Sequence, residues 1–219
     1  MSDAVRPRPM SSARTTLMRT RVPADSLVGR AILSTRFQPG AVVGLGLAAG
    51  LLVPACVLIG GPVVLVALPL IGITALADAS YALLATRSTR LSRRVLVFEP
   101  LAARLAELAW LLGLWFLGAP GWAVALTGAL TWMYVLTRQR ARQVGLRDLG
   151  MTTLGERSVR EVVVALGFGT AGVVALAGGP QFAEWTEGAV TVATTAWMLM
   201  AALGLLQLVI VVSAALRNE

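Results

Sequence analysis

The sequence contains no histidine and no lysine, and it has a single cysteine, Cys56. Without histidine, Ser-His-Asp and Cys-His catalysis, haem ligation by His and His-based metal sites are excluded. One cysteine also excludes an intrachain disulfide and a cysteine-based zinc cluster. Charged residues are scarce, at 14%, against 57% hydrophobic residues and a mean hydropathy of +0.76. This composition excludes an ordinary soluble globule, a disordered chain and a disulfide scaffold.

Most of the hydrophobic residues lie in runs long enough to cross a bilayer. A transmembrane helix needs about 20 predominantly apolar residues. Six segments are near or above this length: 41–60, 62–85, 96–117, 120–137, 158–178 and 188–216. The predicted fold is therefore an all-α integral membrane protein with six transmembrane helices. Pro54 and Pro69 predict kinks in the first two spans. Close helix packing is predicted at small residues in these spans, which are Gly44, Gly46, Gly50, Ala75, Ala77 and Ala79.

The chain before the first span divides into two parts. Residues 1–23 are rich in Arg, Ser, Thr and Pro and lack the apolar core of a signal peptide, so they are predicted to be a retained, disordered basic tail. Residues 24–37 combine Leu27, Ile32 and Leu33 with Arg30 and Arg36. This pattern is typical of a short amphipathic helix that lies on the membrane surface. Residues 38–219 would then form the membrane domain.

All 19 basic residues are arginines, and the formal net charge is +8. They occur in the N-terminal 39 residues, in and around the loops after the second and fourth spans, and at the C-terminus, and Arg104 lies early in the third span. With six spans, these loops fall on one side, and the opposite loops contain no arginine. Arginine-rich loops remain in the cytoplasm. Both termini are therefore predicted to be cytoplasmic, in a cell (inner) membrane protein whose partners are membrane lipids rather than nucleic acid.

Three acidic residues belong to the predicted spans, where charge is costly and is usually functional or paired. Asp78 lies near the cytoplasmic end of the second span, and Glu99 and Glu107 belong to the third. Carboxylates that face each other across two helices, with arginines around them, suit Mg²⁺ or Mn²⁺ and a phosphate group. The alternative is an ion pair that neutralises buried charge, for instance Glu99 or Glu107 with Arg104.

The segment from Asp78 to Ala103 resembles the signature of the CDP-alcohol phosphatidyltransferase family, D-x2-D-G-x2-A-R-x8-G-x3-D-x3-D. Without a gap, Asp78 takes the first Asp, Tyr81 the second, Glu99 the third and Ala103 the fourth. Other segments are similar to the family's opening, third span and fourth-to-fifth loop: FQPGAVVGLGL (37–47), LAARLAELAWLLGLWFLG (101–118), TRQRARQVGL (137–146) and GERSVREVVVALG (155–167). The resemblance covers roughly residues 37–216.

The resemblance implies transfer of a phosphorylated alcohol between a CDP-linked lipid and a hydroxyl acceptor, with release of CMP. It makes Asp78 and Glu99 the predicted ligands of Mg²⁺ or Mn²⁺, held against the donor diphosphate. The fourth Asp of the motif would be the general base. Several arginines are predicted to bind the substrate phosphate, although topology alone would also explain their side: Arg87, Arg138, Arg140, Arg142, Arg157 and Arg160. The family also implies a homodimer, or a heterodimer with a paralogue.

The sequence departs from the family motif at positions that would bind the metal, the nucleotide or the reacting proton. Tyr81 and Ala103 replace two of the four carboxylates, Ala82 replaces a Gly and Thr86 replaces the motif Arg. No residue is assigned as the general base. Glu107, one turn beyond Ala103, is the candidate that could replace it. We therefore predict a divergent member with weakened or lost catalysis. The alternative is a non-catalytic membrane scaffold or regulator of a lipid-synthesis enzyme. A transporter is disfavoured because no inverted repeat is evident.

Overall fold

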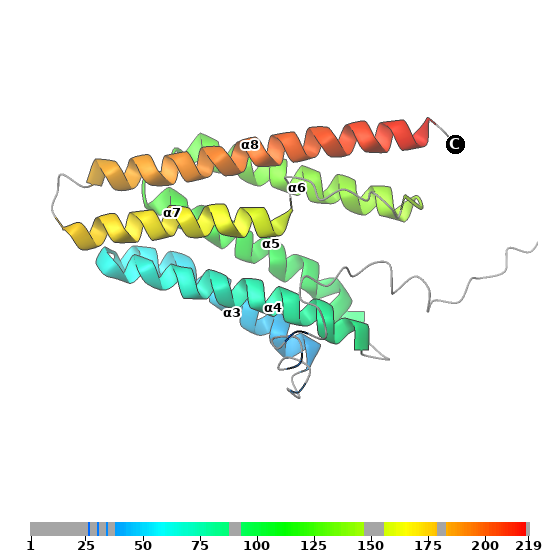
Figure 1. The fold of residues 1–219 in the computed structure, drawn as a ribbon, viewed down its shortest axis with the longest axis horizontal. Coiled ribbons are helices and arrows are strands. Elements are labelled where there is room, and N and C mark those ends of the chain that lie inside the picture. The colour runs from blue at the N-terminus through cyan, green and yellow to red at the C-terminus, as the bar shows by residue number, and fades with distance from the viewer. Residues whose placement is uncertain are drawn as a thin grey trace, which may run out of the picture.

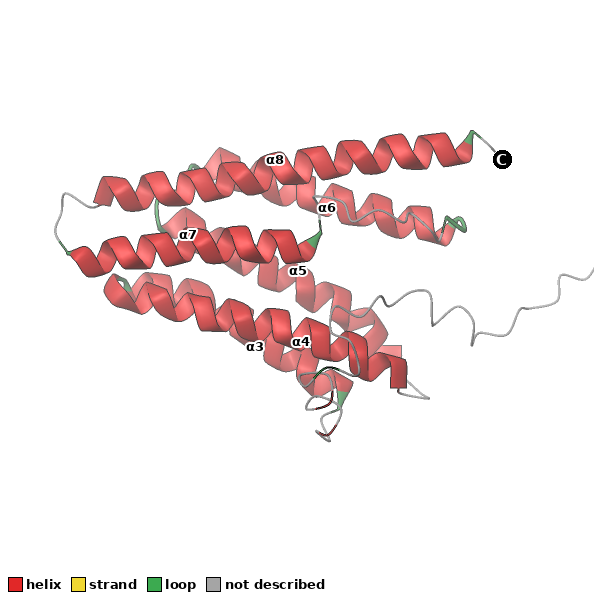
Figure 2. Cartoon of the chain, viewed as in Figure 1, coloured by secondary structure: helices red, strands yellow, loops and turns green. Residues whose placement is uncertain are grey.

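The computed structural model describes residues 38–87, 93–146, 156–178 and 183–217, together with positions 26, 30 and 34. The predicted tail (1–23) and most of the predicted amphipathic segment (24–37) lie outside these residues. Across the described ranges the chain is helical and contains no strand (Figure 2). The elements are α3 (Pro39–Ile59), the 3₁₀ helix η1 (Gly61–Val66), α4 (Ala67–Arg87), α5 (Arg93–Phe116), α6 (Gly121–Gln143), α7 (Arg157–Ala177) and α8 (Ala183–Leu216).

The helices coincide with the six apolar segments of the sequence to within a few residues. Four stretches are long and apolar enough to cross a membrane: Pro39–Ile59, Gly61–Ala85, Arg157–Ala177 and Ala183–Leu216. Helix α5 has 24 residues and α6 has 23, but both are less apolar. Glu99, Arg104 and Glu107 lie in α5, and α6 ends in a run of arginines. The structure thus confirms an all-helical fold over the described residues, in which four helices are long and apolar enough to cross a membrane.

Prolines and glycines shape the first two segments. Pro54 lies inside α3, which nevertheless continues to Ile59. The second segment opens irregularly, because Gly60 (φ 78°) and Gly61 (φ 57°) are left-handed and η1 precedes α4. Pro69 lies in the first turn of α4, where a missing backbone N–H costs nothing in helical hydrogen bonds.

The helices form a bundle in which α3 packs against α4 and α5, and α8 packs against α6 and α7. Between these two groups, α4 and η1 contact α7, and α5 contacts α6 (Figure 1). Helices α5 and α7 approach each other less closely. The large side chains of Trp110, Leu114, Phe168 and Trp197 are fully buried in the core cluster of the bundle.

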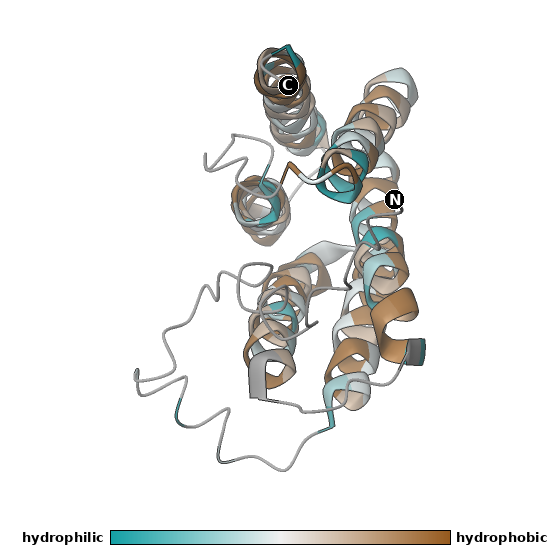
Figure 3. Ribbon diagram, turned by 90° about the vertical axis from the view of Figure 1, so that its right-hand side faces the viewer, coloured by the Kyte–Doolittle hydropathy of each residue, from teal (hydrophilic) through white to brown (hydrophobic). Residues whose placement is uncertain are grey.

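The helix ends separate by charge. Helices α4, α6 and α8 finish at the same end of the bundle at which α3, α5 and α7 begin (Figure 1). We call this the arginine end, because Arg94, Arg138, Arg140 and Arg157 lie there, whereas the described residues at the opposite end include Glu184 and Glu187 but no arginine. Figure 3 looks onto the arginine end and shows hydrophilic residues at the near ends of helices whose bodies are apolar. Arginine-rich and arginine-free helix ends therefore alternate along the chain, as the sequence predicts.

Helix α8 is the longest element, with 34 residues, or about 51 Å at about 1.5 Å per residue. Toward the arginine end it extends well past the start of α7 (Figure 1). Its last turns expose large apolar side chains, including Leu203, Leu206, Val209 and Ile210. No charged residue occurs between Gly188 and Leu216.

Small residues bring α3 close to its neighbours. A Cβ atom added to Gly50 would lie 2.6 Å from Ala106 Cβ and 3.0 Å from Ala106 Cα of α5. One added to Gly46 would lie 2.9 Å from Ala77 Cβ of α4. By contrast, a Cβ atom on Gly44 would meet nothing within 4 Å. The close packing predicted from the sequence is therefore confirmed at Gly46 and Gly50, but not at Gly44.

We expect Gly50→Ala to destabilise the protein, because α3 and α5 must move apart to accommodate the methyl group. Overpacking of this kind costs about 1–3 kcal/mol. Gly44→Ala adds the same methyl group to the same helix in open space, and it is the matched control with an expected change near zero. Thermal unfolding of both variants in detergent checks the prediction. Equal unfolding temperatures would show that the α3–α5 contact does not limit stability.

Candidate functional site

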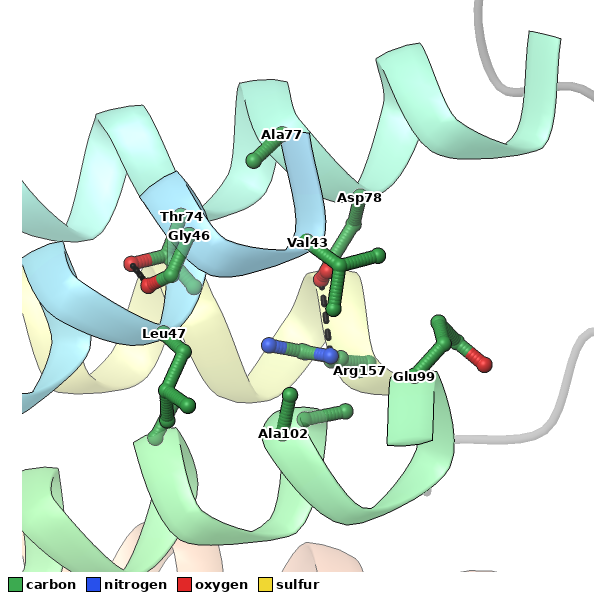
Figure 4. Close-up of a pocket in the computed structure, with 11 residues that line it drawn as sticks. Val43, Gly46, Leu47, Thr74, Ala77, Asp78, Glu99, Ala102 and Arg157 are labelled. Carbon is green, nitrogen blue, oxygen red and sulfur yellow. Dashed lines mark hydrogen bonds and ion pairs between the residues drawn. The ribbon is translucent and has the colours of Figure 1, made fainter. Parts of the chain in front are cut away.

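A small pocket lies toward the arginine end, between α3, α4, α5 and α7 (Figure 4). Its polar and motif-related lining comes from three helices: Asp78 of α4, Glu99 and Ala103 of α5, and Arg157 of α7. The rest of the lining is small or apolar, apart from one threonine: Val43, Gly46, Leu47, Thr74, Ala77, Ala102 and Ala106. Three of the four positions aligned with motif carboxylates therefore meet in one place, although they come from two helices.

Close contacts between α3 and α4 support this pocket. The single hydroxyl proton of Thr74 is shared between two carbonyl oxygens, that of Gly46 in α3 at 3.2 Å (Figure 4) and that of Leu70 in its own helix at 3.0 Å. Tyr81 is buried one turn beyond Asp78 and packs with Val42. The cavity has a volume of about 10 Å³, which is the room that about one water molecule needs.

Arg157 connects the pocket to the interior of the bundle. Its Nη1 lies 2.8 Å from Asp78 Oδ2, and its Nε lies 3.3 Å from Glu161 Oε1 and 3.8 Å from Glu107 Oε1. The guanidinium also lies over the ring of Trp110, with Cζ 5.8 Å from the ring centroid. Such cation–π contacts add to the ion pairs when the cation is desolvated. Arg157 thus holds α4, α5 and α7 together through its own side chain.

Glu107 is the centre of the buried ionic network. Its side chain is 1% exposed and pairs with two further arginines. Arg160 donates from Nη2 to Glu107 Oε1 at 2.7 Å, and Arg104 pairs with Glu107 Oε2 from the preceding turn of α5. The Arg104–Glu107 pair is one of the two arrangements named by the ion-pair alternative. Burial of a charge is tolerated only with such partners.

Glu99 has a different position from the other carboxylates. It lines the pocket and is half-buried. Figure 4 shows its side chain directed away from the Asp78–Arg157 pair. Counted together, the pocket and the network contain four carboxylates (Asp78, Glu99, Glu107, Glu161) and three guanidinium groups (Arg104, Arg157, Arg160). Counted with every group ionised, the formal charge of this region is minus one.

The carboxylates restrict how a metal ion could be held. Within the described residues, no group of three or more His, Cys, Asp or Glu side chains is placed to bind a metal. Asp78 and Glu99 would supply two carboxylates, and Mg²⁺ is commonly held by one or two carboxylates together with waters and substrate phosphates. The predicted metal ligands therefore fit Mg²⁺ or Mn²⁺ only if a phosphate-bearing ligand supplies further oxygen atoms.

The predicted phosphate-binding arginines divide into two sets. Arg157 and Arg160 belong to the buried network, where carboxylates already pair with them. Arg138 and Arg140 lie at the end of α6, where Arg138 donates to the Tyr134 hydroxyl at 2.9 Å and Arg140 donates to Gln143 Oε1 at 3.3 Å. Arg142 is exposed on the same end. Arg87 is the last residue of α4, and its side chain lies outside the described part. Among the five of these arginines whose side chains are described, only Arg157 lines the pocket.

Two participants were not identified from the sequence. Glu161 lies one turn after Arg157 on α7, and this i,i+4 spacing was the available signal for the pair. The second is Trp110, which lies beneath the Arg157 guanidinium. No sequence pattern indicates that a tryptophan of α5 faces an arginine of α7.

Comparison with known proteins leaves the site to be interpreted from its own residues. No protein-family model, no curated protein and no solved structure matches the chain. The observations define a helical membrane protein with a small, acidic pocket and a buried ionic network beside it.

Proposed function

We propose that the chain is a divergent protein of the CDP-alcohol phosphatidyltransferase type, which binds a CDP-linked lipid at the pocket with weakened or lost catalysis. The observation that carries this proposal is the meeting of Asp78, Glu99 and Ala103 in one pocket. These positions align with three of the motif's four carboxylates. In this proposal, Asp78 and Glu99 hold Mg²⁺ or Mn²⁺ against the diphosphate, and Arg157 contributes positive charge.

The same residues explain why catalysis would be weak. Ala103 presents a methyl group where the motif places its base, so nothing at that position accepts the proton of an acceptor hydroxyl. Glu107 is a poor substitute, because it does not line the pocket and is paired with Arg104 and Arg160. When bound, the divalent ion would neutralise the diphosphate and the leaving CMP.

The proposal includes a topology of six spans, with α5 and α6 crossing the membrane beside the four more apolar helices. The arginine end would face the cytoplasm of the inner membrane, with both termini on that side. Its support is the positive-inside rule together with the separation of charge between the two ends of the bundle. A homodimer, or a heterodimer with a paralogue, remains a prediction.

We expect the purified protein in lipid nanodiscs to bind CDP-diacylglycerol in the presence of Mg²⁺ or Mn²⁺, with little or no CMP release across a panel of hydroxyl acceptors. Asp78→Ala should weaken this metal-dependent binding by about tenfold, the change that about 1.4 kcal/mol produces. Glu184→Gln, which removes a carboxylate at the opposite end, is the control and should bind as the natural protein does. Metal-dependent binding that Asp78→Ala leaves unchanged would rule out Asp78 as a ligand.

A specific observation favours the second candidate, a non-catalytic scaffold or regulator of a lipid-synthesis enzyme. The cavity holds about one water molecule, and the Asp78–Arg157 pair lies beside it. A site that stays closed would bind no nucleotide lipid. This candidate predicts co-purification with an intact paralogue and no binding of CDP-diacylglycerol under any metal condition.

A further inference from the structure

Three tryptophan side chains lie exposed at the end of the bundle opposite the arginine end. Trp115 is 51% exposed near the end of α5. Trp122, in the first turn of α6, is 67% exposed, and Trp185, in the first turn of α8, is 70% exposed. Large exposed apolar side chains that gather in one place mark a surface that a membrane or another molecule covers.

The helix ends that carry these tryptophans are held together. Only a short turn separates the end of α5 at Phe116 from the start of α6 at Gly121. The Glu187 side chain of α8 packs against this turn, because a Cβ atom added to Gly118 would lie 3.0 Å from Glu187 Cγ. Trp185 precedes Glu187 by two residues on the same helix. The three exposed tryptophans therefore lie at one level of the bundle.

The other tryptophans of the chain have different positions. Trp110 and Trp197 are fully buried in the core cluster. Trp132 is 43% exposed and follows Trp122 by ten residues on α6, which is about 15 Å along the helix. An indole combines a large apolar ring with one N–H donor, so it is favoured at the level of phospholipid headgroups, where one side is apolar and the other is hydrated. A residue at the end of a helix can reach that level, whereas Trp132 lies near the middle.

The distance from this level to the arginines fits the thickness of a bilayer. On α6, Arg138 follows Trp122 by 16 residues and Arg140 follows it by 18, which is about 24 Å and about 27 Å along the helix. The hydrocarbon core of a bilayer is about 30 Å thick, and an arginine side chain can extend outward from its backbone to keep its charge in water. Helix α6 thus carries an aromatic residue and cations at the separation that a membrane-crossing helix needs.

We propose that Trp115, Trp122 and Trp185 anchor this end of the bundle in the headgroup region of a phospholipid bilayer and so set the depth at which the protein lies. Lipid, rather than another protein chain, is the partner that fits, because the indoles are separated from the arginines by the thickness of a bilayer. Glu107 lies eight residues before Trp115 on α5, or about 12 Å along the helix, so the Glu107–Arg160 pair lies at the depth of the hydrocarbon. Charges at that depth need partners.

Quenching of tryptophan fluorescence by brominated phospholipids tests the depth of each residue. The protein is reconstituted in vesicles whose phospholipids carry bromine either near the headgroup or near the ends of the acyl chains. We expect the emission that is lost in Trp122→Phe and in Trp185→Phe to be the emission that bromine near the headgroup quenches most strongly. Trp132→Phe is the matched control on α6, and the emission that it removes should be quenched most strongly by bromine at the chain ends.

A second measurement tests whether the tryptophans hold the protein at this depth. In the triple variant Trp115→Leu/Trp122→Leu/Trp185→Leu, Trp132 is the remaining exposed tryptophan and reports the depth of α6. Leucine favours the hydrocarbon over the headgroup region, so the bundle should shift across the membrane and carry Trp132 away from the bilayer centre. Quenching of Trp132 by bromine at the chain ends should then fall, and quenching by bromine near the headgroup should rise.

The matched control for the triple variant is Leu58→Ala. Leu58 is 70% exposed near the end of α3, so this substitution removes apolar surface from the same end of the bundle without removing an indole. It should leave the quenching of Trp132 unchanged.

The inference is overturned if bromine near the headgroup quenches Trp122 and Trp185 no more strongly than bromine at the chain ends. Weak quenching of both residues at either depth would also overturn it, because a protein partner would then cover them. A folded triple variant that keeps the natural quenching of Trp132 would show that the indoles do not set the depth. Should the triple variant not fold, Trp122→Leu/Trp185→Leu repeats the test. Neither measurement involves a nucleotide lipid, so the inference and the proposed function fail independently.

Discussion

Glu107→Ala is expected to remove about 3–5 kcal/mol of stability, the cost of breaking a buried ion pair from one side. The substitution leaves Arg160, which is 3% exposed, without its carboxylate at 2.7 Å. It also removes the partner of Arg104 and one carboxylate near Arg157. Because folded proteins are stable by only about 5–15 kcal/mol, the loss should be large in a thermal unfolding experiment in detergent.

Two companion variants separate the network from the loss of a side chain. The double variant Glu107→Leu/Arg160→Leu removes both charges of the Glu107–Arg160 pair. This variant should lose less stability than Glu107→Ala alone, because no arginine is left opposite a missing carboxylate at that contact. Glu184→Gln neutralises a carboxylate at the other end of the bundle and should unfold as the natural protein does. If Glu107→Ala unfolds at the same temperature as Glu184→Gln, the network does not stabilise the fold.

Restoring the two missing carboxylates, by Tyr81→Asp with Ala103→Asp, should raise CMP release from CDP-diacylglycerol by about a hundredfold or more, since general-base catalysis contributes about 10²–10⁴. Ala103 lines the pocket with Glu99 and Asp78, so the new carboxylate enters an existing acidic site. Release of CMP with Mg²⁺ and a panel of alcohols is the measurement, and the alcohol consumed would identify the acceptor.

The restored variant has its own controls. Tyr81 is 6% exposed and packs in a small apolar cluster, so its replacement by Asp will reduce stability. Ala103→Asp alone tests the base without that loss, and adding Asp78→Asn to either variant should abolish any gain. A folded variant that still releases no CMP would mean that the pocket is not a transferase site, and it would favour the scaffold.

Hydropathy predicted the helices well, because each apolar run is close to or above the length that a membrane-spanning helix needs. The structure reproduces all six segments, and the added details are the left-handed Gly60 and Gly61 and the 3₁₀ helix η1. Small residues predicted close packing correctly at Gly50 and incorrectly at Gly44. A run of glycines does not reveal which of its members faces a neighbouring helix, because that depends on how the helix is rotated in the bundle.

The ionic network was harder to predict, because its partners depend on the relative depth of two helices. Glu107 lies about four turns into α5, whereas Arg160 lies in the first turn of α7, yet the two side chains are in contact. Helix α7 therefore begins deep in the bundle, and this brings Arg157 and Arg160 to carboxylates of α4 and α5. The resemblance of residues 155–167 to a family loop predicted that these arginines lie near a phosphate. It gave no information on how far along the bundle axis helix α7 begins.

The length of α8 has a consequence for the lipid around the protein. The uncharged part of α8, from Gly188 to Leu216, has 29 residues and is about 44 Å long, whereas the hydrocarbon core of a bilayer is about 30 Å thick. The exposed leucines, Val209 and Ile210 continue the apolar surface into the last turns of the helix. In a membrane, tilting of α8 or local thickening of the bilayer would accommodate this excess, at fractions of a kcal/mol per Å. We therefore expect the protein to be better accommodated in thick bilayers than in thin ones.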